Sequence, residues 1–153
     1  MLPSLFALLI SLALVGIAAS TGARFRPDSW YRELNKPAWT PPDIAFPIAW
    51  GILYLLMAIA AWRIYMADDS AWRTAGLTVY ALQLMANAAW SWLFFGRKQI
   101  AAALGDIALL LMLIMLAIFV FAKVSALAAW LMVPYALWVA LALCLNATIW
   151  RRN

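Results

Sequence analysis

Residues 30–54 read WYRELNKPAWTPPDIAFPIAWGILY and form the longest polar interruption in a very apolar chain. Four of the chain's seven prolines lie in this stretch, and a fifth, Pro27, lies just before it. The stretch also contains Trp30, Trp39 and Trp50. Prolines stiffen the chain by fixing φ, and a plain connector between two membrane helices needs neither this length nor tryptophan. We interpret the stretch as a lid that folds back over a cavity between helices. The alternative is an interfacial loop whose Trp and Tyr side chains anchor at the lipid headgroups.

The composition indicates an integral membrane protein. Of the 153 residues, 69% are hydrophobic and 11% are charged, and a soluble domain of this size cannot bury so much apolar surface. We expect one membrane domain over residues 1–153. The net charge of +5 comes from basic residues at the ends of apolar runs, which is typical of topology signals rather than of nucleic-acid binding. Because the chain has no histidine, it lacks the usual haem ligand, zinc ligand and general base, and we expect no metal site.

Five apolar runs predict an all-α bundle of five transmembrane helices with a long first loop that acts as a lid. Their approximate ranges are 1–20, 45–65, 73–95, 100–122 and 126–150. Since no basic residue precedes Arg24, we take the first run as a span rather than a signal peptide. In the loop, Asp28 is expected to cap a short helix that extends to about Asn35. Pro134 is expected to kink the last span.

The distribution of basic residues predicts the orientation. Five spans place the first loop, the Arg97–Lys98 turn and the C-terminus on one side, with eight Lys and Arg residues against three on the other. The positive-inside rule then puts the first loop and the C-terminus in the cytoplasm and the N-terminus outside. No internal repeat is visible, and an odd number of spans argues against a transporter built from two equal halves.

Aromatic and amide side chains deep in the spans suggest a binding site. Trp138 lies about twelve residues, roughly 18 Å, into its helix, which is past the middle of a hydrocarbon core about 30 Å thick. Gln83 and Asn87 are amides that are costly in hydrocarbon, so their helix face is expected to point inward together with Trp90 and Phe94. Either these rings fill space between helices, or they surround a pocket for a large, flat, mostly apolar ligand. The candidate lining residues are Trp50, Tyr54, Asn87, Trp90, Tyr135, Trp138 and Ala142.

Two further side chains were weighed as sites. Asp106 is a charged residue inside a span, which makes it a functional candidate by default. It lies about two turns from the start of its helix, and a structural role near the loop is favoured. Cys144 is more easily explained as a small apolar filler than as a ligand. The sequence has no phosphate-binding glycine loop and no catalytic triad.

Four motifs together resemble a known family. They are WY-x-x-L-x-KP-x-W-x-PP at 30–42, P-x-AWG-x-LY at 47–54, QL-x-x-N-x-x-W-x-x-x-FFG at 83–96, and PY-x-x-W-x-A-x-A-x-x-LN-x-x-x-WR at 134–151. In this order they resemble the TspO/translocator protein family, also called tryptophan-rich sensory proteins or peripheral benzodiazepine receptors. The resemblance covers essentially the whole chain.

The resemblance implies a five-helix bundle, usually a homodimer, with a ligand cavity closed by the first loop. It also implies binding of porphyrins, haem and isoquinoline- or benzodiazepine-type drugs, and some bacterial members are reported to break down porphyrin in light. By motif position it assigns the site to Tyr31 in the lid, to the pocket tryptophans Trp50 and Trp138, and to Asn87, Trp90, Ala142 and Leu145. The animal members' cholesterol motif has a tyrosine soon after the Leu-Asn pair, where this chain has Ala147, so sterol binding there is not expected.

Three functions from different classes follow. The leading hypothesis is a membrane receptor for tetrapyrroles such as protoporphyrin IX or haem, which acts as sensor, scavenger or carrier and requires no cofactor. The second is a light-dependent porphyrin-degrading enzyme in which Trp50 and Trp138 react with the excited ligand. The third is a scaffold that regulates partner membrane proteins and has only an incidental cavity.

Overall fold

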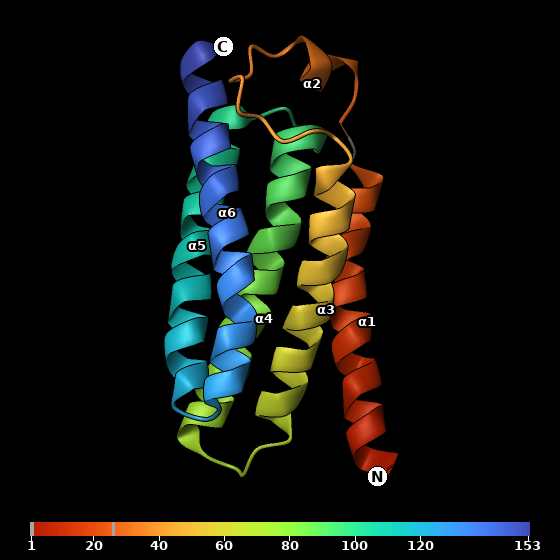
Figure 1. Ribbon diagram of the computed structural model, residues 1–153, viewed down its shortest axis with the longest axis vertical. Coiled ribbons are helices and arrows are strands. Elements are labelled where there is room, and N and C mark those ends of the chain that lie inside the picture. The colour runs from red at the N-terminus through yellow and green to blue at the C-terminus, as the bar shows by residue number, and fades with distance from the viewer. Residues whose placement is uncertain (1, 26) are drawn as a thin grey trace.

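The computed structural model describes residues 2–25 and 27–153, and over these residues it contains six α-helices, one π-helical turn and no strand (Figure 1). The elements are α1 (Leu2–Arg24), α2 (Ser29–Glu33), α3 (Ala45–Tyr65), α4 (Ala71–Ser91), η1 (Trp92–Gly96), α5 (Ile100–Ala122) and α6 (Ala126–Arg152). Met1, where the first span was expected to begin, and Arg26, one of the basic residues counted for topology, lie outside the described residues.

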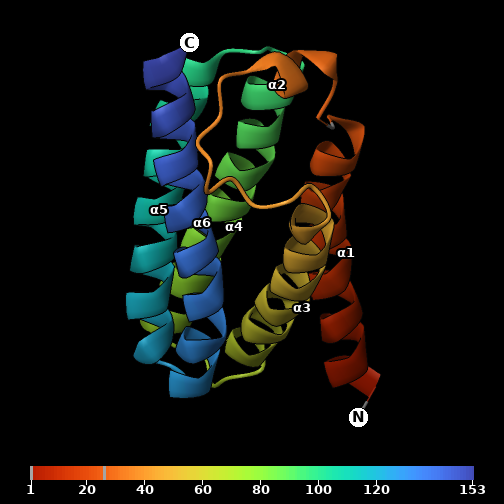
Figure 2. The ribbon, with the colours of Figure 1, turned by 45° about the horizontal axis from the view of Figure 1, so that its top comes forward.

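The long helices α1, α3, α4, α5 and α6 run side by side as one bundle (Figures 1 and 2). In this bundle α5 packs mainly on α6 and α4, and α1 packs on α3. The N-terminus lies at one end of the bundle, whereas the C-terminus and the loop that contains α2 lie at the other (Figure 1). Residues 27–44 of this loop are called the first loop below. The structure thus places the first loop, the turn after η1 and the C-terminus at the same end, as the sequence predicts.

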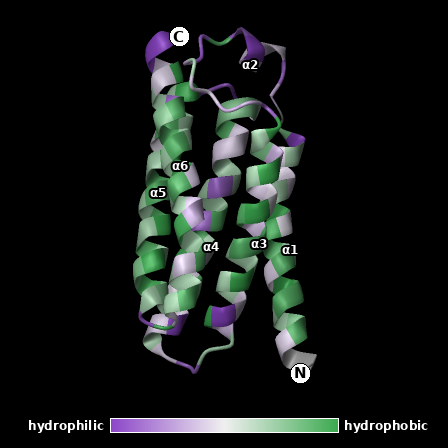
Figure 3. Ribbon diagram, viewed as in Figure 1, coloured by the Kyte–Doolittle hydropathy of each residue, from purple (hydrophilic) through white to green (hydrophobic). Residues whose placement is uncertain are grey.

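The helices fit an integral membrane protein. Four of them are long and apolar enough to cross a bilayer: Ser4–Arg24 within α1, and all of α3, α5 and α6. The expected count of five spans is not met by this criterion, because α4 is not among them. Helix α4 is as long as α3, at 21 residues, but it carries more polar side chains. Hydrophobic residues dominate the long helices, and hydrophilic ones gather at helix ends, in the loops and part-way along α4 (Figure 3).

The predicted helix ranges hold for the central elements and fail at several ends. The predictions for 45–65 and 100–122 coincide with α3 and α5. Helix α1 continues past Ser20 to Arg24, because the Ser20 and Thr21 hydroxyls donate to carbonyls one turn earlier and leave the helix unbroken. The run expected to be helical over 73–95 begins earlier, at Ala71, and changes to a π-helical turn at Trp92.

The ends of the shorter segments follow local capping chemistry. As predicted, Asp28 caps α2, and its Oδ1 accepts the Tyr31 N–H at 3.2 Å. The helix ends at Glu33 rather than at about Asn35, because Leu34 adopts an extended conformation with ψ 140°. Ser70 and Ser125 cap α4 and α6 in the same way. Helix α6 continues through Pro134.

Close packing between α4 and α5 depends on a residue without a side chain. A Cβ added to Gly76 would lie 3.2 Å from the Cδ1 and Cε1 atoms of Phe121, which is itself fully buried. A Cβ added in the same way to Gly105, on α5, would have no atom of the described residues within 4 Å. The two helices can therefore approach at Gly76 only while that position stays small.

We predict that Gly76→Val lowers the free energy of unfolding by about 1–3 kcal/mol, because the added methyl groups force Phe121 to shift. Gly105→Val is the matched control, since it makes the same change to backbone freedom in open space. Thermal unfolding in detergent micelles, followed by circular dichroism, measures both variants. Equal midpoints for the two variants would contradict this account of the α4–α5 contact.

Candidate functional site

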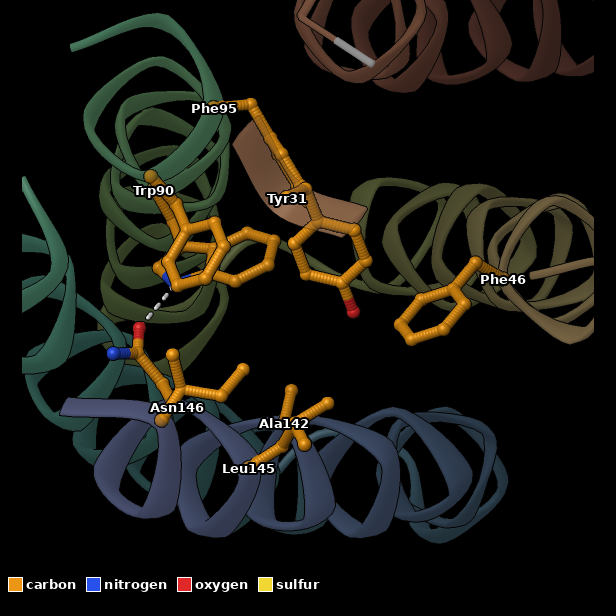
Figure 4. Close-up of a pocket in the computed structure, with 9 residues that line it drawn as sticks. Tyr31, Phe46, Trp90, Phe95, Ala142, Leu145 and Asn146 are labelled. Carbon is orange, nitrogen blue, oxygen red and sulfur yellow. Dashed lines mark hydrogen bonds between the residues drawn. The ribbon is translucent and has the colours of Figure 1, made fainter. Parts of the chain in front are cut away.

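A small pocket lies beneath the first loop, at the end of the bundle that carries the C-terminus (Figure 4). Its walls come from α2, α3, the α4–η1 segment and α6, and they are mostly aromatic or aliphatic. The lining residues are Tyr31, Phe46, Trp90, Phe94, Phe95, Ala142, Leu145, Asn146 and Ile149. The remaining void has a volume of about 20 Å³, which is room for about one water molecule.

Tyr31 forms the roof of the pocket. It lies on α2, is 4% exposed, and points its hydroxyl toward the space between Phe46 and Ala142 (Figure 4). The Lys36 ammonium lies 4.4 Å from the centroid of the Tyr31 ring and donates to the Tyr31 carbonyl at 2.6 Å. Burial raises the pKa of the Tyr31 phenol, and the negative charge of Asp43 adds to the rise. The roof is therefore a neutral phenol at physiological pH.

The π-helical turn η1 builds the wall that receives Tyr31. The turn is closed by a hydrogen bond from the Arg97 N–H to the Trp92 carbonyl at 2.8 Å, which is the spacing of a π-helix. Phe94 and Phe95 then both contact the Tyr31 ring edge-on, with centroids at 6.2 Å and 5.4 Å. Such turns are frequent at functional sites, and here the turn brings two successive rings to one surface.

Trp90 and Asn146 fix the opposite wall. The Trp90 indole stacks on Phe94 with centroids 5.4 Å apart, and its Nε1–H donates to Asn146 Oδ1 at 3.1 Å. The Asn146 Nδ2 in turn donates to the Ile100 carbonyl at 3.0 Å. These bonds connect α4, α5 and α6, and the Ile100 carbonyl anchors the wall from outside the pocket lining.

A chain of hydrogen bonds joins α3, α4 and α6 further along the bundle. The Tyr54 hydroxyl donates to Asn87 Oδ1 at 2.8 Å, and Asn87 Nδ2 donates to the Tyr135 hydroxyl at 2.9 Å. Tyr135 donates to Gln83 Oε1 at 2.9 Å. The prediction that the amide stripe of α4 faces inward is confirmed, since Gln83 and Asn87 are buried.

Trp50 and Trp138 lie next to this chain and to the pocket. The Trp50 ring stacks on Tyr54 at 5.3 Å and meets Tyr135 edge-on at 6.1 Å. Trp138 meets Phe46 edge-on at 5.7 Å, and Phe46 is itself a pocket residue. Among the described residues, the buried Trp138 Nε1 has no hydrogen-bond acceptor. An indole N–H in such a place usually finds a partner, so this donor is open to a ligand atom.

The structure brings the predicted site residues together in two adjoining groups. Four of the nine, Tyr31, Trp90, Ala142 and Leu145, line the pocket. Tyr54, Asn87 and Tyr135 form the hydrogen-bonded chain beside Trp50, and Trp138 adjoins the pocket through Phe46. An open chamber lined by both Trp50 and Trp138 was expected, but neither residue lines this pocket, and its aromatic walls leave a void of only about 20 Å³.

Sequence reasoning missed five lining residues. Phe94 shared the predicted inward face of Asn87, so helical spacing had indicated its direction without assigning it to the site. The others are Phe46, Phe95, Asn146 and Ile149. Phe95 and Asn146 lie in the quoted motifs but were not assigned to the site, and Phe46 and Ile149 carried no signal in the sequence.

Charged groups lie at the rim rather than in the pocket. Lys98 Nζ lies 3.0 Å from Asp28 Oδ2, and its hydrogen bond holds the pKa of the Asp28 carboxyl below its ordinary value.

Asp106, on α5, has a buried Oδ2 without a hydrogen-bond partner among the described residues, so the structural partner expected for it is not found there. Over residues 2–25 and 27–153, no three His, Cys, Asp or Glu side chains are placed to hold a metal ion.

The chain is similar to proteins from bacteria and mammals. It is 38% identical over 137 residues to protein CrtK of Rhodobacter capsulatus, a match that covers 89% of this chain and 86% of the relative. It is 39% identical over 142 residues to the tryptophan-rich sensory protein of Cereibacter sphaeroides, covering 93% and 88%. It is 34% identical over 126 residues to the human translocator protein, covering 81% and 75%. A family model described as the TspO/MBR family matches residues 6–151. The pocket, the amide stripe and the tryptophans all lie within that match, and the chain therefore belongs to the TspO/MBR family.

Proposed function

We propose that this protein is a five-span membrane receptor that binds a tetrapyrrole between its helices, beneath the first loop as a lid. The observation that carries the proposal is the buried, unpaired indole N–H of Trp138 beside an aromatic pocket roofed by Tyr31. The curated relatives are named sensory or translocator proteins, which supports a role in sensing or carrying a ligand.

The chemistry of the walls favours a flat and largely apolar ligand. Trp90, Phe94 and Phe95 pack ring against ring, and a planar conjugated ligand replaces such contacts with stacking of similar strength. Directed polar contacts are few, as expected of a site for an apolar molecule. Iron ligation by histidine is excluded because the chain has no histidine, so bound haem requires another axial group or none.

Binding requires movement, because a void of about 20 Å³ is far below the roughly 300–1,000 Å³ of ligand pockets. The rings that fill the space include Tyr31, on the first loop, and Phe46, in the first turn of α3. Displacement of the first loop removes Tyr31 from the roof and exposes the faces of Trp90 and Trp138. The first loop is therefore proposed to admit the ligand by lifting away from α6.

The proposal includes an arrangement in the membrane. Helix α4 is the fifth crossing, because its polar side chains turn into the bundle and are paired there. The N-terminus lies outside, and the first loop and C-terminus lie in the cytoplasm, according to the basic residues. A homodimer is proposed from the family resemblance.

We predict that Trp138→Phe weakens binding of protoporphyrin IX about fivefold or more, the factor that corresponds to one lost hydrogen bond. The substitution keeps an aromatic ring beside Phe46 and removes the N–H. Trp130→Phe is the matched control, since Trp130 lies on the same helix and is 69% exposed. Quenching of porphyrin fluorescence during titration measures each dissociation constant. Equal affinities for Trp138→Phe, Trp130→Phe and the unmodified protein would remove Trp138 from the site.

A second candidate function, light-dependent breakdown of the bound porphyrin, is favoured by the ring contacts of Trp50 with two tyrosines. An excited porphyrin is able to take an electron from a nearby indole, and the adjoining phenols are able to return one. We predict that, if this occurs, illumination in oxygen bleaches the porphyrin absorption bands faster in the unmodified protein than in Trp50→Phe. Trp130→Phe and porphyrin in empty micelles are the controls. Porphyrin absorption bands that persist under light in the unmodified protein would contradict porphyrin breakdown and leave the receptor function as the proposal.

A further inference from the structure

The first loop is held at two opposite sides of the pocket, and the two attachments differ in kind. On the side of η1, Lys98 pairs with Asp28 and the ring of Tyr31 packs on Phe94 and Phe95. On the side of α6, the contacts are hydrogen bonds with the side chains of Arg152, the last residue of α6, and Asn153, which follows it. Since the pocket lies between these sides, the loop cannot lift from α6 while the second set of bonds persists.

The contacts on the α6 side form a compact group, Asn35, Lys36, Arg152 and Asn153, which we call the C-terminal latch. The Asn35 N–H donates to Asn153 Oδ1 at 3.0 Å, and Asn153 Nδ2 donates back to the Asn35 carbonyl at 3.4 Å. The side-chain amide of Asn153 thus pairs with one backbone unit of the loop in both directions. Arg152 Nη1 donates to the next carbonyl, that of Lys36, at 3.3 Å.

The latch is held in position from the helix side. Asn153 Nδ2 also donates to the Ile149 carbonyl at 2.9 Å, and Ile149 is a buried residue that lines the pocket. On the loop side, Pro37 follows Lys36 directly and is buried, and two further prolines, Pro41 and Pro42, precede α3. Fixed proline φ angles restrict the backbone of this segment. Release of Arg152 and Asn153 removes the hydrogen bonds that attach the first loop to the end of α6.

We propose that Arg152 and Asn153 hold the first loop closed, and that release of the C-terminal latch is the step that opens the pocket on the α6 side. The proposal rests on the proposed function only in that the first loop is taken as the lid of the ligand site. Asp28 and Lys98 then serve as the hinge, because their ion pair attaches the loop to the turn after η1 and is not broken by this movement. The ligand enters between the first loop and α6, next to Ala142 and Leu145.

The latch is tested first without any ligand, by hydrogen exchange of the first loop in the full-length protein in lipid nanodiscs. The reporter is the amide of Thr40, which donates to the Pro37 carbonyl at 3.0 Å and does not contact Asn153. Exchange at this amide requires the turn between Pro37 and Thr40 to open, and we expect the turn to open more often once Asn35 and Lys36 are released from the latch. We predict that Asn153→Ala raises the Thr40 exchange rate about fivefold, as expected for the loss of one net hydrogen bond, and that adding Arg152→Ala raises it further.

Arg151→Ala is the matched control for Arg152→Ala, because it removes the same charge from the same helix end at an exposed residue for which the structure describes no contact, and it also serves as a neighbouring truncation for Asn153→Ala. Its Thr40 exchange is expected to equal that of the unmodified protein. Equal exchange in Asn153→Ala and Arg151→Ala would overturn the latch.

Ligand kinetics in the same variants separate the latch from the proposed function. If the first loop is the lid, Asn153→Ala increases the rate at which protoporphyrin IX dissociates by the same factor as the Thr40 exchange, whereas Arg151→Ala does not. Faster Thr40 exchange with unchanged ligand rates would establish the latch and refute the role of the first loop as the lid. Unchanged Thr40 exchange would refute the latch whatever the ligand does.

Discussion

Polar groups in the middle of a membrane bundle must find their partners within the protein, because lipid offers none. Asn87 meets this constraint with both atoms of its amide, through the hydroxyls of Tyr54 and Tyr135, and Gln83 meets it through its oxygen, which accepts from Tyr135. The chain of bonds fixes how α4 is rotated against α3 and α6, since any other rotation would leave two amides unpaired in hydrocarbon. Trp90 on α4 and Phe94 on η1 continue the stripe of Gln83 and Asn87, so the rotation that pairs the amides also directs these rings into the pocket. The functional wall is thus a consequence of hydrogen bonding about one helical turn away.

The pocket itself reflects a competition between packing and binding. An empty space among helices forfeits dispersion contacts, and the structure avoids that loss by filling the space with the rings of Tyr31, Phe46 and Phe94. A ligand must therefore replace protein rings rather than enter a vacant cavity. The cost of this replacement falls on the first loop, which is attached by short-range contacts at its edges. In the proposed opening, the aromatic walls are exposed only while the first loop is lifted, which limits contact between those walls and the lipid or water outside.

Unpaired polar atoms mark the places where the protein's own packing is incomplete. Among the described residues, Trp138 Nε1 has no hydrogen-bond acceptor, and this atom lies next to the pocket. The Tyr80 hydroxyl and Gln83 Nε2, further along α4, also have no hydrogen-bond partner there. Only the first of these adjoins the pocket, through Phe46. Buried donors of this type are uncommon in folded proteins, and at a site where rings must move they supply a directed contact without disturbing the bonds that hold the helices together.

The sequence by itself determined the class of the protein, the bounds of α3 and α5, the inward face of α4, the cap at Asp28 and membership of the family through its four motifs. These features depend on local periodicity, on capping chemistry and on the composition of each run. The tertiary structure alone decided that the walls include Phe46, Phe95 and Ile149, that η1 ends α4 with a π-helical turn, and that the cavity is almost filled. It also decided the pairing of Asn35 with Asn153, which are 118 residues apart. The physical reason is that such contacts depend on the relative height and rotation of whole helices, and a repeating pattern within one helix specifies its buried face but not the residue it meets there.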